Sequence, residues 1–185
     1  MARSAHPPLT YDDLVALPDD GLRHELIDGE HFVSASPNTK HQRVSGNFYY
    51  VVRAFLHDHP RGEIFYAPYD VVFSPINVVV PDLLYVSHER SGVLTDRYAQ
   101  SAPDLVIEIL SPSTRGMDQV RKRDLYDRFG VGEYWIADPF RDAIRVYRRG
   151  AGGLVLAAEL SVAAGDLLTT PLLPGLEIQL TEVFA

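Results

Sequence analysis

The chain has 185 residues, 46% of them hydrophobic and 23% charged, with no cysteine and a formal net charge of −8. Such a composition is typical of a single globular domain, here spanning residues 1–185. The lack of cysteine excludes a disulfide framework and a thiolate zinc site, and it favours a cytoplasmic location. We find neither a signal-peptide core nor a bilayer-length apolar run, so we expect no membrane partner. The acidic balance excludes a broad basic face for nucleic acid, and any such contact must be local.

The first predicted elements are a short helix, a hairpin and a long helix. A capping-box pattern predicts a helix over residues 10–17. The dipeptide Asp28-Gly29 is a strong hairpin signal and separates two short strands, residues 23–27 and 30–35. Apolar residues then recur at helical spacing over residues 39–59 and predict the first long helix.

Three apolar runs follow, and we predict that each is a strand: EIFYAPYDVVF (63–73), VVVPDLLYV (78–86) and DLVIEIL (104–110). A second helix is predicted from about residue 115 to residue 129, where Gly130 ends it. Strands are predicted at EYWIAD, AIRVYRR and LVLAAEL, and the tail LEIQLTEVF is either a last strand or a short helix. The order of helix, three strands, helix and strand predicts an α/β (α+β) protein. Its mixed sheet is flanked by helices, preceded by a β-hairpin and followed by appended strands.

Two acidic residues lie inside these apolar runs, Asp82 in VVVPDLLYV and Glu108 in LVIEIL. Both runs are apolar at odd and even positions, which is typical of strands covered on both faces. An ionised carboxylate in such a place is costly unless it is paired, hydrogen-bonded or bound to a metal. We therefore expect a divalent cation held by Asp82 and Glu108.

A lysine on the second helix is predicted to reach the same place. The strand rises about 3.3 Å per residue and the helix about 1.5 Å, so a helix that folds back returns Lys122 to the level of Glu108. On the helix, Lys122 shares a face with Asp118 and Tyr126. The alternative is a surface ion pair between Asp118 and Lys122, worth a few tenths of a kcal/mol.

Three further residues could support the site. If the first two strands pair about a turn near Ile76, Asp70 lies almost opposite Asp82, although Asp70 could instead bond to a loop. His41 should point toward the sheet from the first helix, either as a structural residue or to orient a phosphate or water. Glu25, in the first hairpin strand, either adds a carboxylate or is an ordinary exposed strand residue.

The most basic local stretch is residues 115–128, in which basic residues outnumber acidic ones. It either contacts nucleic acid or is a solvated helix with ion pairs along its surface. The members of this stretch are Arg115, Arg121, Lys122, Arg123 and Arg128 against Asp118, Asp124 and Asp127.

The combined motifs resemble the Uma-two family of bacterial endonucleases, within the PD-(D/E)XK restriction-endonuclease-like superfamily. The segments that carry the resemblance span roughly residues 10–184. They are RHELIDGE, KHQRVSGNFYYVV, VVVPDLLYV, APDLVIEILSPST and KRDLYDRFGVGEYWIADP. The resemblance implies a restriction-endonuclease-like αβββαβ core and metal-dependent hydrolysis of phosphodiester bonds, with DNA as the expected substrate.

Carried over by position, Pro81-Asp82 matches the PD element and Glu108 matches the acidic position of the (D/E)XK element. The linear motif is broken because Leu110 stands where the lysine is usual, and Lys122 would supply the amine instead. The resemblance implies Mg²⁺ or Mn²⁺ bound by Asp82 and Glu108, with the backbone carbonyl of Ile109 as a further ligand.

Two other functions compete with a nuclease. One is a catalytically silent module of nuclease fold that binds nucleic acid or protein, and the other is a metal-dependent hydrolase of small phosphate compounds. The apolar segment LEIQLTEVF, together with the hairpin of residues 23–35, also leads us to expect a homodimer.

Overall fold

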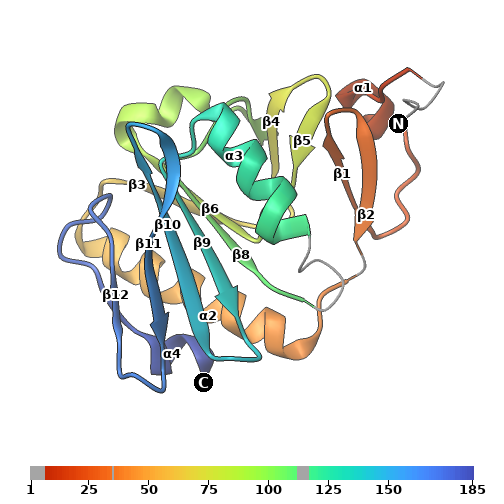
Figure 1. Ribbon diagram of the computed structural model, residues 1–185. Coiled ribbons are helices and arrows are strands. Elements are labelled where there is room, and N and C mark those ends of the chain that lie inside the picture. Colours follow the sequence, from red (N-terminus) through yellow and green to blue (C-terminus); the bar gives the residue numbers. More distant parts are fainter. Residues whose placement is uncertain (1–6, 35, 112–116) are drawn as a thin grey trace.

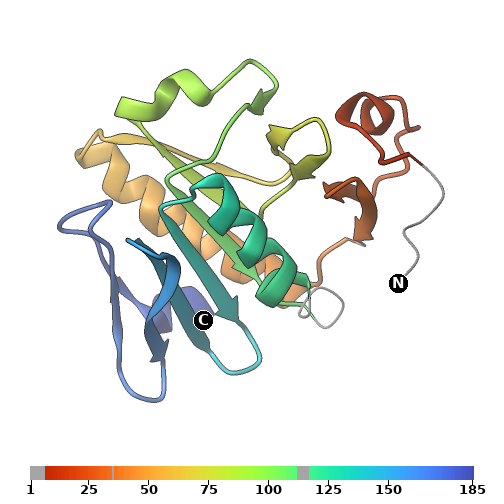
Figure 2. The same cartoon turned by 45° about the horizontal axis from the view of Figure 1, so that its top comes forward.

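The structure is a computed structural model that describes residues 7–34, 36–111 and 117–185. Its centre is a six-stranded mixed sheet in the order β11-β10-β9-β8-β6-β3, and a five-stranded sheet in the order β2-β1-β5-β4-β7 stands beside it. Helix α2 covers one face of the six-stranded sheet and α3 covers the other (Figures 1 and 2). This is the mixed α/β architecture with flanking helices that the order of elements predicted.

The N-terminal half contains the hairpin, the long helix and most of the strands that surround the site. The elements are α1 (Tyr11–Val15), β1 (Arg23–Ile27), β2 (Glu30–Ser34), α2 (Thr39–Asp58), β3 (Gly62–Tyr66), β4 (Asp70–Ser74), β5 (Asn77–Val79), β6 (Leu83–Ser87), the 3₁₀ helix η1 (His88–Val93), β7 (Tyr98–Ala99) and β8 (Leu105–Ile109). Helix α2 begins at an Asn38 cap, whose side chain accepts the backbone N–H of His41. The predicted hairpin and long helix are both confirmed.

The C-terminal half completes the central sheet and closes the core on the α2 side. The elements are the π-helical turn η2 (Met117–Lys122), α3 (Arg123–Phe129), β9 (Glu133–Asp138), β10 (Ala143–Gly150), β11 (Gly153–Ser161), β12 (Leu167–Thr169), β13 (Glu177–Gln179) and α4 (Leu180–Phe184). The predicted start of the second helix at residue 115 lies outside the described residues. Gly130 ends α3 in the left-handed conformation, as its position predicted.

The two long apolar runs are each divided between the two sheets. Residues 63–73 form β3 and β4, while residues 78–86 contribute to β5 and β6, with Pro68 and Pro81 at the breaks. Proline has no N–H to donate to a ladder, so pairing stops there and each half joins a different sheet. The register pairs Val71 with Val79, which makes Val80 the neighbour of Asp70. The predicted placement of Asp70 opposite Asp82 is therefore wrong.

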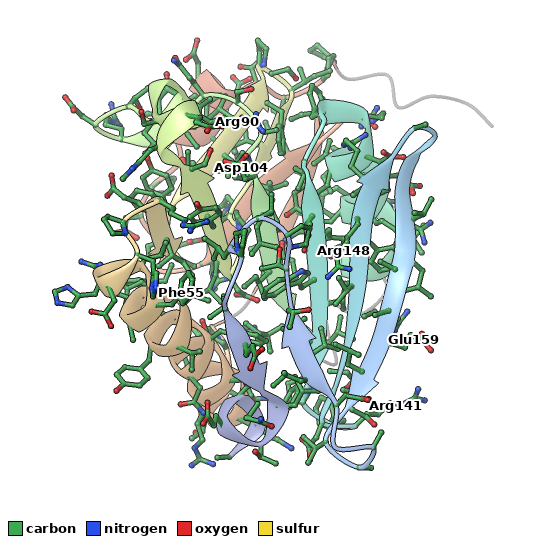
Figure 3. All side chains as sticks on the ribbon, turned by 90° about the vertical axis from the view of Figure 1, so that its left-hand side faces the viewer. Phe55, Arg90, Asp104, Arg141, Arg148 and Glu159 are labelled. Atoms are coloured by element: carbon green, nitrogen blue, oxygen red, sulfur yellow. The ribbon has the colours of Figure 1, made fainter. Side chains whose placement is uncertain are left out.

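The C-terminal segment packs inside the chain. Figure 3 shows it lying between α2 and the strands β10 and β11, and Phe55 of α2 contacts this layer. Apolar side chains of β13 and α4 are buried there, among them Ile178, Leu180 and Val183. Their apolar surface is therefore unavailable between subunits, which removes one reason for expecting a homodimer.

None of the described helices combines the length and the apolar character that crossing a membrane would need.

Candidate active site

Five pieces of the chain converge at one end of the central sheet (Figure 1). They are the end of β8, the residues just before β6, the first turn of α2, the turn η2 with α3, and the hairpin strand β1. The register pairs Leu83 with Ile107 in antiparallel strands. Extending it by one residue sets Asp82 opposite Glu108 on the same face of the sheet, as directly opposed strand residues are.

The Asp82 carboxylate is buried and accepts three interactions. Its Oδ2 accepts the backbone N–H of Ile109 at 2.9 Å and lies 3.0 Å from Nε2 of His41. Its Oδ1 accepts from Nη1 of Arg23 at 2.7 Å. His41 thus points from α2 toward the sheet as predicted. Its Nδ1 has no hydrogen-bond partner among the described residues.

The Glu108 carboxylate is also buried and meets the predicted lysine. Its Oε1 accepts from Nζ of Lys122 at 2.9 Å and from the hydroxyl of Tyr126 at 2.7 Å. Lys122 also lies 2.9 Å from Oε1 of Glu25, so one ammonium group bridges two carboxylates. Glu25 in turn accepts the backbone N–H of Val80 at 2.8 Å.

The hairpin strand β1 therefore adds two charged side chains to a site built on the other sheet. Arg23 and Glu25 are two residues apart on one strand, so they share a face. Glu25 was among the predicted supporting residues, whereas Arg23 was missed. The sequence did contain a signal for Arg23. In RHELI, Arg23 stands two residues before Glu25, so on a strand both side chains lie on one face and near the same site.

Burial and pairing oppose each other in setting the protonation of the cluster. Burial raises the pKa of Asp82, but the hydrogen bond from His41 and the charge of Arg23 outweigh it and lower that pKa to about 2. For Tyr126, burial and the neighbouring Glu108 carboxylate both raise the pKa well above its usual value. Asp82 is therefore an anion, and Tyr126 a neutral donor, at neutral pH.

The donor set suits a hard divalent cation. Carboxylate and carbonyl oxygens are the ligands that Mg²⁺ and Mn²⁺ prefer. In a strand, the N–H and C=O of one residue point to the same side, so the carbonyl of Ile109 is directed to the edge where its N–H meets Asp82. Among the described residues no group of three or more His, Cys, Asp or Glu side chains is arranged to hold a metal. Water or substrate would complete the coordination of a cation bound here.

A cavity of about 260 Å³ adjoins the cluster. It is lined by the first turn of α2, including Lys40 and His41, by Leu110 at the end of β8, and by Phe140 in the turn after β9. The N-terminal end of a helix favours anions because its first N–H groups point outward along the dipole. The cavity is thus a concave, locally electropositive space beside His41, whose ring contacts Asp82.

Several predicted residues lie elsewhere or outside the described side chains. Asp70 accepts a hydrogen bond from the hydroxyl of Tyr11 at 3.2 Å, and burial raises its pKa; it is not part of the cluster. Leu110 is buried in the core on the α3 side, so the usual lysine position of the motif is an apolar one. The side chain of Asp118 lies outside the description, as does Arg115.

The basic stretch of the second helix is largely paired. Arg121 binds Glu30 at 2.8 Å and Arg128 binds Asp28 at 2.9 Å, so both link the helix to the hairpin. Lys122 is buried in the site. The interpretation as a helix with surface ion pairs therefore accounts for Arg121 and Arg128.

A family model described as "Uma2: Putative restriction endonuclease" matches residues 11–181. The chain belongs to this family. The match covers the hairpin that carries Arg23 and Glu25 as well as Asp82, Glu108 and Lys122, so the whole cluster lies within the Uma2 region. No curated protein matches the sequence significantly.

A solved structure has the same fold. It is described as the crystal structure of a "putative nuclease belonging to DUF820" from Anabaena variabilis, and it is 21% identical to this Uma2 chain. The TM-score is 0.79, and the alignment covers 96% of this chain and 98% of that one. The likeness confirms the fold expected from the family resemblance.

Proposed function

We propose that the protein is a divalent-metal-dependent endonuclease that hydrolyses phosphodiester bonds of DNA. The observation that carries the proposal is the buried cluster in which Asp82 and Glu108 stand opposite each other and Lys122 lies 2.9 Å from Glu108. Membership of a family described as restriction endonucleases supports nuclease chemistry. Mg²⁺ or Mn²⁺ held by Asp82, Glu108 and the Ile109 carbonyl would activate water and neutralise charge on the reacting phosphate.

The chain's own residues have separate tasks in this proposal. Asp82 is kept ionised and oriented by Ile109 and His41, so its position does not depend on the substrate. Lys122 holds Glu108 in place and supplies positive charge beside the reacting phosphate. Tyr126 donates to the same oxygen of Glu108 and limits its rotation. The cavity at the first turn of α2 would hold the anionic backbone beside His41, which contacts Asp82.

The decisive experiment combines cleavage with metal binding. Purified protein is incubated with plasmid and linear DNA in Mg²⁺ or Mn²⁺, with chelator as the control, and metal binding is titrated by calorimetry. We expect cleavage only with the cation, and loss of both cleavage and metal binding in Asp82→Ala and Glu108→Ala. Unchanged metal affinity in both variants would rule out the site. Metal binding without cleavage of any DNA or RNA would favour the silent binding module.

Mutation of Lys122 distinguishes an active nuclease from a catalytically silent module of the same fold. We expect Lys122→Ala to reduce cleavage at least about 100-fold, because a charge aimed at the transition state is lost, while metal binding remains, because an ammonium group cannot ligate the ion. Lys122→Arg should not restore cleavage, since the guanidinium is larger and differently shaped. Arg145→Ala is the control for loss of a positive charge, because among the described residues Arg145 pairs with Glu159, away from the carboxylate cluster and its cavity. Wild-type cleavage by Lys122→Ala would contradict its assigned task.

A further inference from the structure

The two oxygens of Asp82 differ in what a cation would have to displace. Oδ2 is bound by a backbone N–H within β8 and by His41, which sits on the buried face of α2. Moving the N–H would require moving the strand, and the ring of His41 is held in a buried place, with 8% of its side chain exposed. Among the described residues, Oδ1 is bound by the end of one long, flexible side chain, that of Arg23. Oδ1 is therefore the oxygen that a metal ion can bind, once it displaces the guanidinium of Arg23.

Arg23 also differs from the rest of the cluster in its exposure. Its side chain is 27% exposed, whereas those of Asp82, Glu25, Glu108 and Lys122 are 3–5% exposed. It stands at the end of β1, three residues before the point where that strand pairs with β5 at Leu26. A guanidinium on a flexible stem at such a position can leave Oδ1 toward solvent without a backbone change.

The charges of the cluster indicate what a released guanidinium would bind. Among the described residues, three buried carboxylates, Asp82, Glu25 and Glu108, are paired with two arginine or lysine side chains, Arg23 and Lys122. Addition of a divalent cation would turn this single negative excess into a single positive one. A phosphodiester carries one negative charge, and its two free oxygens match the fork of an arginine.

We propose that Arg23 occupies the metal-binding oxygen of Asp82 in the metal-free protein and, once released, binds the substrate phosphate. The inference rests on the proposed function, because it takes the metal site and the phosphodiester substrate from it. This exchange of Arg23 between Asp82 and the substrate phosphate makes metal binding and DNA binding depend on each other. Each ligand must then strengthen the other, as linkage between two sites requires.

The first test is metal affinity without DNA. In calorimetric titrations with Mn²⁺, we expect Arg23→Gln to bind the ion roughly tenfold more tightly than the wild type, because a competing cation is gone. Arg121→Gln is the matched control, since it removes the same charge nearby but contacts Glu30 and not the carboxylate cluster; its affinity should change less than about twofold. Unchanged or weaker Mn²⁺ binding by Arg23→Gln would overturn the proposal.

The second test is DNA binding with and without a cation. In chelator, a short labelled duplex should bind wild type and Arg23→Gln equally, because Asp82 holds the arginine. With Ca²⁺, another oxygen-seeking cation, Arg23→Gln should bind at least about tenfold more weakly than wild type. Its slope of log affinity against log salt should be smaller by about 0.9, the value for one lost phosphate contact. Equal affinities in Ca²⁺ would overturn the second half of the proposal.

Two variants keep the outcome interpretable. Arg23→Lys retains a cation for Asp82 but loses the planar fork, so it should bind Mn²⁺ like the wild type and DNA more weakly. If Arg23→Gln is destabilised, its melting temperature in Mn²⁺ is compared with its own melt in chelator, and the rise should exceed that of the wild type. Asp82→Asn reports on the proposed function: if the wild type binds Mn²⁺ and Asp82→Asn does not, an unchanged Arg23→Gln refutes only the role of Arg23.

Discussion

At the scale of residues, the candidate site is a network of largely buried charges in which each carboxylate is paired with a described arginine or lysine side chain. Neutral substitution of one member leaves its partners buried and uncompensated, which is costly in a low-dielectric interior. The network explains how two carboxylates can lie opposite each other before any metal ion binds. Arg23 pairs with Asp82 and Lys122 pairs with Glu108, and these positive charges offset the repulsion between the two carboxylates. It also makes stability a second readout of the site besides activity.

The lowered pKa of Asp82 predicts a specific loss of stability in acid. Its folded pKa, about 2, lies below the ordinary value of 3.8. The stabilisation is therefore complete above about pH 4 and is lost as the pH falls from about 4 to about 2. We expect the wild type to lose about 2 kcal/mol more than Asp82→Asn over this window, measured by urea unfolding in chelator. Parallel curves for the two proteins would contradict the lowered pKa.

Tyr126 provides a milder test of the network. Tyr126→Phe removes the donor to Glu108 at 2.7 Å but keeps the ring in the core. Because the acceptor is a buried carboxylate, we expect the free energy of unfolding to fall by about 1–3 kcal/mol. Tyr50→Phe is the control, since Tyr50 is 73% exposed and should change stability by less than about 0.5 kcal/mol. Equal effects of the two substitutions would mean that the hydrogen bond contributes nothing.

At the scale of elements, the first turn of α2 and the ends of two strands set the geometry of the site. The cap at Asn38 fixes the N–H of His41 and with it the angle at which the ring approaches Asp82. The breaks at Pro68 and Pro81 end β3 and β5 before the site, so that Asp82 lies just outside β6 rather than within a ladder. Element ends, which have unpaired backbone groups, therefore supply most of the site.

The cap of α2 can be tested directly. Asn38→Ala removes the side-chain acceptor for the N–H of His41, and we expect it to cost about 1 kcal/mol of stability. Asn38→Asp keeps an oxygen at the same place and should retain most of that stability. Chemical denaturation of the three proteins measures both values. An equal loss in Asn38→Asp would show that the oxygen is not the stabilising feature.

At the scale of the whole molecule, two apolar cores lie on the two faces of the central sheet, one under α2 and one under α3. The carboxylate cluster joins the central sheet to the hairpin sheet, because Arg23 of β1 contacts Asp82 and Glu25 of β1 contacts Lys122. The C-terminal segment closes the α2 core, and Asn47 of α2 donates to the carbonyl of Val183. The tail is therefore part of the structural core, on the face of the central sheet that α2 covers.

Removal of residues 180–185 should unfold the protein or leave it barely stable. The deletion exposes the surface covered by Leu180, Val183 and Phe184. Burial of three such side chains is worth on the order of 5 kcal/mol, comparable to the entire stability of a small domain. Circular dichroism and thermal melts of the shortened chain test this, with removal of Ala185 alone as the control. A shortened chain that melts within a few degrees of the wild type would contradict it.

Most of the elements and the central acidic pair were predictable from the sequence, although the runs 63–73 and 78–86 each form two strands and not the predicted one. Runs with apolar residues at both odd and even positions marked β6 and β8 as strands covered on both faces, so the carboxylates of Asp82 and Glu108 were expected to be buried and partnered. Rise per residue along a strand and a helix was enough to bring Lys122 to Glu108. These inferences succeeded because periodicity and length are local properties, and they depend little on which distant segment supplies the neighbour.

The distant groups that complete the site are set by tertiary packing. It divided two apolar runs between two sheets, paired Asp70 with Tyr11, placed Arg23 on Asp82 and buried the C-terminal segment against α2. Each of these depends on register and on the packing of elements far apart in the chain. A shift of one residue turns a strand's side chains to the opposite face, and the local pattern of apolar and polar residues does not specify which partner a charged side chain will meet.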